Sequence, residues 1–147
     1  MACRPHLLII SITLASTFGV PSFSQTANSC NDIEGYYWCK DPFTGEETQN
    51  VIYQSTDGSF ESKVVWVKNL KLAHYIGMVF MTGLKFDADT NQWSGGKAGY
   101  PGKKSKYSIV AYFDKKKPNK LKLRGYVGVE LFGMTTTWIK EKAIRES

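Results

Sequence analysis

The feature that most constrains the fold is an alternation of apolar and polar residues, interrupted about every ten residues by Gly, Asn, Asp or Pro. Alternation with a period of two is typical of a β-strand with one buried face, and the interrupting residues are those that tight turns require. No helical period runs through the chain beyond residue 24. We therefore predict strands at residues 35–40, 48–55, 59–67, 75–87, 92–100, 104–114, 120–127 and 129–140.

These predicted strands follow one another with short connections, which favours antiparallel neighbours because parallel neighbours need long crossovers. An antiparallel up-and-down β-barrel of about eight strands leaves no unpaired sheet edge. We expect a single all-β domain of this kind, since 147 residues leave no room for a second core. A sandwich of two sheets is the alternative architecture.

The interior of such a barrel holds either a solid core or one small ligand. Aromatic residues make up 14% of the chain, with eight Phe, eight Tyr and four Trp, and many of them fall on the predicted inward faces. We expect non-catalytic binding of a small apolar ligand. The residues expected to contact it are Phe60, Trp66, Met78, Phe80, Phe86, Tyr107 and Phe113. A filled barrel that serves as an interaction or structural module of the cell envelope is the alternative.

The N-terminal segment has the pattern of a secretory signal peptide. Arg4 precedes the apolar run 7–15, which is too short to span a bilayer, and small residues stand at Ser22 and Ser24. We expect residues 1–24 to be a signal peptide cleaved before Gln25, and residues 25–147 to form the barrel domain. The protein is then exported, to the periplasm or outside the cell, and we expect no transmembrane span in the mature chain.

Export has a consequence for the cysteines. Cys30 and Cys39 are the two that remain after cleavage, and in an oxidising compartment such a pair is most simply a disulfide. We predict a Cys30–Cys39 bond that ties the N-terminal arm to the first strand.

Residue patterns that carry catalysis or bind metals are missing from the mature sequence. It contains one histidine, His74, and no Gly-x-Ser-x-Gly motif, so a nucleophile activated by a base is not indicated. Residues 87–91 superficially resemble a calcium loop but lack its glycine and its distant glutamate. We expect no enzyme activity, no cofactor and no metal.

The basic excess, a net charge of +6, gathers on one predicted hairpin. Its lysines form a stripe that offers a contact for an anionic envelope surface: Lys104, Lys106, Lys115, Lys116, Lys117, Lys120 and Lys122. Outward aromatic residues that would stack on bases are few, so we expect no nucleic acid partner. We expect a monomer.

Motifs in the second half of the chain resemble one known family. They comprise Trp93, Gly95, Gly96, Arg124, Gly125, Tyr126, Gly133 and Trp138. These residues and their spacing resemble the domain of unknown function 2147 family of exported bacterial proteins. The resemblance implies an exported bacterial domain and supplies no chemistry. Tyr100 and Met134 stand where that family usually has Asp and Arg.

The roles expected for these motif residues are structural. A Trp that closes a barrel end, or an Arg stacked over it, recurs in barrels of the lipocalin and avidin type, which the predicted architecture resembles by analogy. We therefore predict that the Arg124 guanidinium stacks on the Trp138 ring.

Overall fold

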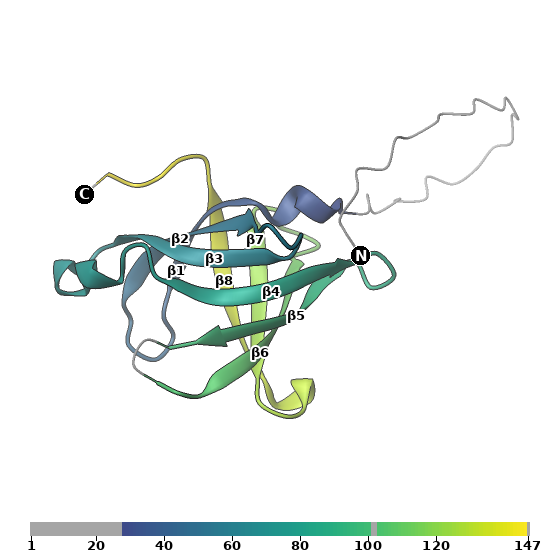
Figure 1. The fold of residues 1–147 in the computed structure, drawn as a ribbon. Coiled ribbons are helices and arrows are strands. Elements are labelled where there is room, and N and C mark those ends of the chain that lie inside the picture. Colours follow the sequence, from purple (N-terminus) through teal and green to yellow (C-terminus); the bar gives the residue numbers. More distant parts are fainter. Residues whose placement is uncertain (1–27, 101–102, 147) are drawn as a thin grey trace, which may run out of the picture.

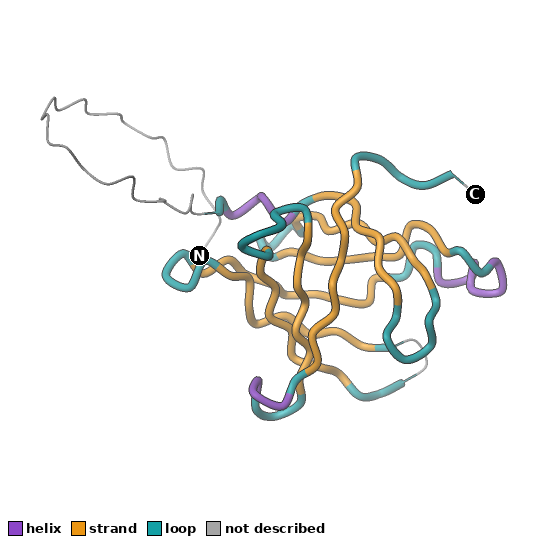
Figure 2. The backbone as a smooth tube through the Cα atoms, turned by 180° about the vertical axis from the view of Figure 1, so that it is seen from behind, coloured by secondary structure: helices purple, strands orange, loops and turns teal. Residues whose placement is uncertain are grey.

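Eight antiparallel strands form a closed barrel in which each strand pairs with the next in the chain and the last pairs with the first (Figures 1 and 2). The computed structural model describes residues 28–100 and 103–146, so the predicted cleavage site before Gln25 lies outside the described residues. The strands are β1 (Gly35–Lys40), β2 (Glu47–Gln54), β3 (Phe60–Val67), β4 (Val79–Asp87), β5 (Gln92–Gly99), β6 (Lys106–Phe113), β7 (Lys120–Tyr126) and β8 (Met134–Glu141). The prediction of an all-β up-and-down barrel is confirmed.

Two of the predicted strands begin four and five residues later than expected, and a short 3-10 helix precedes each of them. These helices are η2 (Leu70–Tyr75), before β4, and η3 (Glu130–Phe132), before β8. A third, η1 (Cys30–Ile33), precedes β1. No helix in the described ranges is long and apolar enough to cross a membrane.

The connections divide the barrel into two ends. The η1 end carries η1 and the turns at residues 55–59, 88–91 and 114–119. The opposite end, which we call the open end, carries the connections at residues 41–46, 68–78, 100–105 and 127–133, including η2 and η3. In Figure 1 the open end lies along the left and lower sides of the barrel, away from η1.

The η1 end is closed by packing of η1 against the interior. Ile33 is fully buried, and the Tyr37 hydroxyl donates a hydrogen bond to its carbonyl at 2.9 Å. The indole Nε1 of Trp93 donates to the Cys30 carbonyl at 3.0 Å. The Trp93 ring packs on Phe86 and Phe113, with ring centroids 4.9 and 5.6 Å apart. An aromatic cluster around the fully buried Trp93 therefore packs at this end.

Bulges in β4 change which of its residues face inward. Strict alternation predicts that Phe80, Leu84 and Phe86 share one face, but the register against β3 shifts twice, between Phe60 and Ser62 and between Ser62 and Lys63. Each shift adds a residue on β4, so Met81 and Leu84 are both fully buried. Gly83, at φ +77°, supplies the left-handed conformation that one of these bulges needs.

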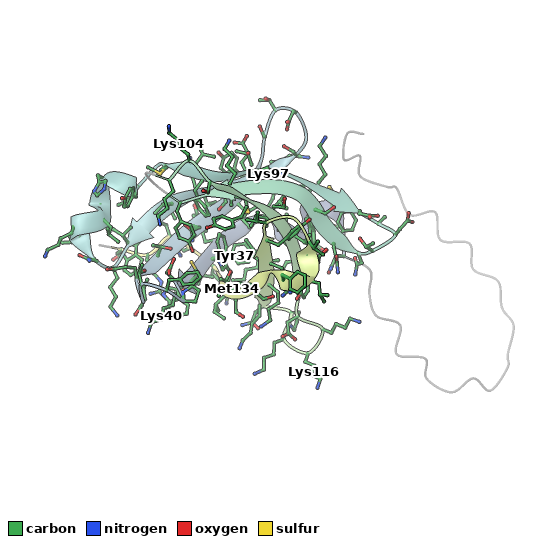
Figure 3. All side chains as sticks on the ribbon, turned by 90° about the horizontal axis from the view of Figure 1, so that it is seen from below. Tyr37, Lys40, Lys97, Lys104, Lys116 and Met134 are labelled. Atoms are coloured by element: carbon green, nitrogen blue, oxygen red, sulfur yellow. The ribbon has the colours of Figure 1, made fainter. Side chains whose placement is uncertain are left out.

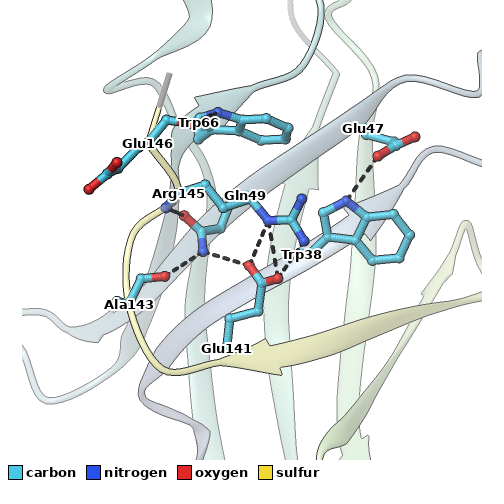
Figure 4. A network of polar contacts seen from close by, with 8 residues as sticks. All are labelled: Trp38, Glu47, Gln49, Trp66, Glu141, Ala143, Arg145 and Glu146. Atoms are coloured by element: carbon cyan, nitrogen blue, oxygen red, sulfur yellow. Dashed lines mark hydrogen bonds and ion pairs between the residues drawn. The ribbon is translucent and has the colours of Figure 1, made fainter.

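The C-terminal tail, residues 142–146, packs against the outer face of β1, β2 and β3 (Figure 4). Trp38, Gln49 and Trp66 form a row across these strands. The Arg145 guanidinium lies over the rings of Trp38 and Trp66, 5.7 and 5.2 Å from their centroids. Trp66 is therefore on the outside, and the expectation that it lines the interior is wrong because the shift between Gln49 and Asn50 reverses the alternation of β3.

The expected Cys30–Cys39 disulfide is not formed in this structure, where Cys39 is a free cysteine. Cys30 begins η1, whereas Cys39 lies near the far end of β1. The extended strand carries Cys39 about 13 Å beyond Gly35 at roughly 3.3 Å per residue. A disulfide requires two Cα atoms within about 7 Å, so this geometry separates the pair.

Candidate ligand-binding site

A cavity of about 210 Å³ opens at the open end of the barrel, between β4, β5 and β6. It is lined by Met78, Val79, Phe80, Thr82, Lys97, Gly99, Tyr100 and Lys106. Phe80 faces the interior, as alternation predicts, and its ring lies 5.9 Å from the buried Trp138 ring. Phe80 therefore connects the cavity to the core, while the outward cross-strand pair Thr82 and Lys97, together with Lys106, forms its exposed edge.

Tyr100 forms one wall of this cavity and links it to the neighbouring connections. Its ring meets the Tyr107 ring edge-on, with centroids 6.1 Å apart. Burial and the carboxylate of Asp41 raise the pKa of Tyr100 to about 12, so its hydroxyl stays protonated at neutral pH. The neutral phenol adds no charge to the wall, and its hydroxyl interacts with the Asp41 carboxylate.

A small polar group lies on β1 and β2, inside the barrel and near the same end. The Asn50 amide donates to the Cys39 sulfur at 3.3 Å and to the Thr48 hydroxyl at 3.2 Å. The Thr48 hydroxyl also lies 3.3 Å from the Cys39 sulfur. Burial raises the pKa of the Cys39 thiol, which opposes formation of the reactive thiolate.

The residues predicted to contact a ligand are distributed over the whole barrel. Met78 and Phe80 line the open-end cavity, and Tyr107 lies behind its Tyr100 wall. Phe60 is fully buried, and Phe86 packs in the Trp93 cluster with Phe113. The structure thus brings together only part of the predicted set, since Trp66 lies outside and the others fill the core.

A second, shallower cavity of about 400 Å³ lies at the η1 end, lined by Asn28, Asn31, Asp32, Phe113, Pro118 and Lys140. Its central group is the Lys140 ammonium, which donates to the Asp32 carbonyl at 2.8 Å. The same ammonium lies over the rings of Tyr37 and Phe113. Burial lowers the pKa of Lys140, although Asp32 and Glu34 oppose the shift. The Lys140 ammonium is therefore already engaged by groups of the protein itself.

The predicted lysine stripe is divided between the two ends. Lys115, Lys116 and Lys117 are exposed on the β6–β7 turn, while Lys104 and Lys106 are exposed at the open end. Figure 3 shows Lys104 and Lys116 on opposite sides of the molecule.

Between these ends, the amine of Lys122 donates to the Thr137 hydroxyl at 2.7 Å and lies 3.9 Å from the Asp114 carboxylate. Lys120 is half-buried at the start of β7. The stripe is therefore two separate groups of free amines.

The described residues do not group in a way that holds a metal ion, since no three His, Cys, Asp or Glu side chains among them converge. His74 lies in η2, where its ring stacks on the Tyr75 ring with centroids 4.0 Å apart.

Comparison with known proteins agrees with this description. The model of a family described as uncharacterized proteins conserved in bacteria, domain of unknown function 2147, matches residues 35–140. The chain belongs to this family. A solved structure, protein HP1028 from the human pathogen Helicobacter pylori, described as belonging to the lipocalin family, is similar in fold with a TM-score of 0.59. The two are 17% identical, and the likeness covers 75% of this chain and 83% of that chain. No curated protein matches the sequence.

Several residues that carry the domain of unknown function 2147 motifs hold the barrel together. Trp93 closes the η1 end, as described above. Arg124 lies on the outer face and binds η3: Nε donates to the Glu130 carbonyl, Nη2 to the Leu131 carbonyl and Nη1 to the Thr135 hydroxyl, each at 2.9 Å.

Trp138, in contrast, points into the barrel and is 5% exposed. The predicted stack of Arg124 on Trp138 is therefore wrong, because Arg124 lies on the outer face of the barrel wall and Trp138 on its inner face.

Two features of the site were not predicted from the sequence. The role of Tyr100 in the cavity wall depends on its approach to Tyr107, which lies beyond the β5–β6 connection. The tail contact of Arg145 depends on two outward Trp residues that lie on different strands. Of the residues in this contact, only Trp38 could be placed on the outer face from the sequence, because it follows the inward Tyr37 in the same strand.

Proposed function

We propose that this member of the family is an exported protein that binds one end of a small apolar ligand at the open end of the barrel, without catalysing a reaction. The observation that carries this proposal is the difference between the two ends. At one end Trp93 and η1 pack over the core and the cavity is shallow, whereas at the other Met78, Phe80 and Tyr100 line a cavity in which the Phe80 ring contacts the buried Trp138. A lipocalin-like fold with one accessible end supports ligand binding, although the likeness itself concerns the fold alone.

The size of the cavity limits what it holds. About 210 Å³ is below the roughly 300–1,000 Å³ of pockets that enclose a whole drug-sized ligand. We therefore propose that an acyl chain or a similar apolar group inserts its end between Phe80 and Tyr100, while the rest of the ligand stays outside. The lysines at the edge, Lys97 and Lys106, then lie near any anionic head group.

The experiment combines recovery and titration. Intact mass spectrometry of protein from its own host is expected to give a chain that begins at Gln25, and the native spectrum to show an added apolar molecule. Titration of delipidated protein with dodecanoate is expected to change tryptophan fluorescence, because Trp138 contacts Phe80. Met78→Arg, which places a charge in the lining, is expected to weaken dodecanoate binding by about tenfold or more.

Trp66→Phe is the matched control, since Trp66 lies on the outer face against the tail, and its dodecanoate affinity should equal that of the wild type. A protein that is repeatedly recovered empty and shows no fluorescence change with dodecanoate would contradict ligand binding. A mature chain that retains Met1 would contradict export and leave the binding result unaffected.

A further inference from the structure

The open end of the barrel presents nearly all of the large apolar side chains that the described residues expose. They are Phe43, Leu70, Ile76, Val79, Tyr100, Val127, Val129, Leu131, Phe132 and Met134, and Ile144 in the tail is the exception. All four connections of the open end contribute. The turns of the η1 end instead expose Thr, Asp, Asn and Lys, together with the small Ala88 and Pro118. Soluble surfaces rarely gather apolar groups so unevenly, and such gatherings mark interaction sites.

The apolar side chains at the tips of these connections are held outward by ordered structure. Phe132 is 84% exposed and Leu131 is 76% exposed, yet Arg124 binds two carbonyls of η3. Gly133 packs so closely on β7 that a Cβ atom on it would lie 2.7 Å from the Gly125 carbonyl oxygen. The exposure of Leu131 and Phe132 is therefore a property of the fold.

The connection that contains η2 is ordered in the same way. Asn69 caps η2 by accepting the Lys71 N–H at 3.2 Å, and its amide donates to the Glu46 carboxylate at 3.0 Å. This contact joins η2 to the β1–β2 connection, whose Phe43 is 70% exposed. Leu70, 74% exposed, projects from the same structure.

Positive charge surrounds these apolar tips. The open end exposes Lys40, Lys68, Lys71, Lys103, Lys104 and Lys106. These six lysines outnumber the four carboxylates of the same end, Asp41, Glu46, Glu47 and Glu130, of which Glu47 pairs with Lys68 at 2.7 Å and Glu130 is exposed on η3. Figure 3 shows Lys40 and Lys104 projecting on the side of the barrel where η2 lies. The outward charge at this end is therefore basic.

Apolar side chains surrounded by lysines are suited to the interface of a bilayer, where the apolar groups contact hydrocarbon and the lysines contact anionic head groups. A folded partner or a second copy of the chain needs a continuous complementary surface, whereas here the tips lie on four separate connections across the width of the barrel. A fluid bilayer accepts separate tips independently. We propose that the open end docks on the surface of a bilayer that contains anionic lipid, with Phe132, Leu131, Leu70 and Phe43 entering the interface.

This docking does not require that the cavity bind a ligand. If both proposals hold, the cavity between β4, β5 and β6 faces the bilayer, because its lining residues Val79 and Tyr100 belong to the same exposed set. An apolar molecule then passes between bilayer and barrel without crossing water.

The test is co-sedimentation with vesicles of phosphatidylethanolamine containing one-third phosphatidylglycerol. All variants are made in the full chain, and intact mass establishes that they share the same N-terminus, so residues 7–15 cannot account for differences among them. The double variant Leu131→Ser/Phe132→Ser is expected to lower the partition coefficient by about tenfold or more, since it removes two large apolar side chains from the interface. Its urea midpoint should stay unchanged because both side chains are exposed.

Two control variants separate this surface from others. Ile144→Ser removes an exposed apolar side chain outside the open end, and Lys115→Gln/Lys116→Gln/Lys117→Gln neutralises the turn at the η1 end. Both are expected to bind vesicles as the wild type does. Raised salt is expected to weaken wild-type binding.

Three results would overturn the proposal. The first is a wild-type chain that stays in the supernatant. The second is a loss of binding in the triple lysine variant equal to that of the double serine variant. The third is a double serine variant that changes the oligomeric state in light scattering while its vesicle binding persists, because this indicates a second copy of the chain as the occupant of the open end.

Discussion

Close backbone contacts at single residues shape the open end of the barrel. A Cβ atom on Gly133 would lie 2.7 Å from the Gly125 carbonyl oxygen and 3.0 Å from the Tyr126 Cβ. Real Cβ atoms do not approach backbone oxygens so closely, and neither neighbour belongs to a flexible side-chain end. The glycine is therefore required for β8 to begin beside the end of β7.

Gly133→Ala is expected to lower the free energy of unfolding by about 1–3 kcal/mol, because either β8 or η3 has to move away. Urea denaturation followed by tryptophan fluorescence measures this change. Gly99→Ala is the matched control, since a Cβ there meets its nearest atom at an ordinary 3.7 Å. If Gly133→Ala and the wild type have the same free energy of unfolding, the end of β7 moves away from the new Cβ atom at little cost.

Among the elements, the C-terminal tail is held by a combination of charge and aromatic contacts (Figure 4). The Gln49 amide donates to the Glu141 carboxylate and the Ala143 carbonyl, while its oxygen accepts the Arg145 N–H at 2.8 Å. The Arg145 guanidinium pairs with Glu141 and lies over two Trp rings. Gln49 is completely buried under this tail.

Arg145→Ala is expected to lower the free energy of unfolding by about 1 kcal/mol at pH 7, the sum of a partly exposed ion pair and cation–π contacts. Arg145 and Gln49 hold the pKa of Glu141 below its usual value. The contribution of ionised Glu141 to the free energy of unfolding is therefore complete above its unfolded pKa of about 4.3. It is lost as the pH falls through the lower pKa that Glu141 has in the folded protein. The stability difference between wild type and Arg145→Ala should shrink below about pH 4, as urea midpoints measured against pH will show.

Lys142→Ala tests the same segment without touching these contacts, because Lys142 is exposed. It should unfold like the wild type at every pH. A constant difference between Arg145→Ala and the wild type from pH 7 to pH 3 would show that the Glu141 ion pair contributes nothing.

At the scale of the whole molecule, closure of the barrel and packing of η1 give its two ends different characters. Pairing of β1 with β8 leaves no free edge in the sheet. At the η1 end aromatic rings pack around the buried Trp93, whereas the open end exposes apolar tips and contains the half-buried Cys39 thiol. Access to this thiol therefore reports on the integrity of the closed barrel.

Cys39 is expected to react with iodoacetamide on the order of a hundredfold more slowly in the native protein than in urea, since burial protects the thiol and raises its pKa. Peptide mapping without reductant should find Cys39 alkylated after unfolding. Detection of a Cys30–Cys39 disulfide in the mature protein would contradict the free thiol of this structure.

The sequence by itself determined the class and topology of the fold, because a two-residue period with frequent turns leaves few alternatives to antiparallel neighbours. It also located the inward positions of β6 and β7, where Ile109, Ala111, Leu121 and Leu123 are buried as the alternation predicts, although Val110 on the opposite face of β6 is buried as well. Local patterns are sufficient where the strands are regular.

Only the tertiary structure decided which residues meet at the ends of the barrel. Bulges in β3 and β4 move Trp66 to the outside and bring Met81 inside, and a bulge is an added residue in one partner that alternation along a single strand does not reveal. The contact of Arg145 with two Trp rings joins residues that are distant along the chain. The separation of Cys30 from Cys39 and the position of the exposed apolar side chains at one end depend on the direction of the strands. Such contacts form only when the barrel closes, because its closure sets which connections share an end.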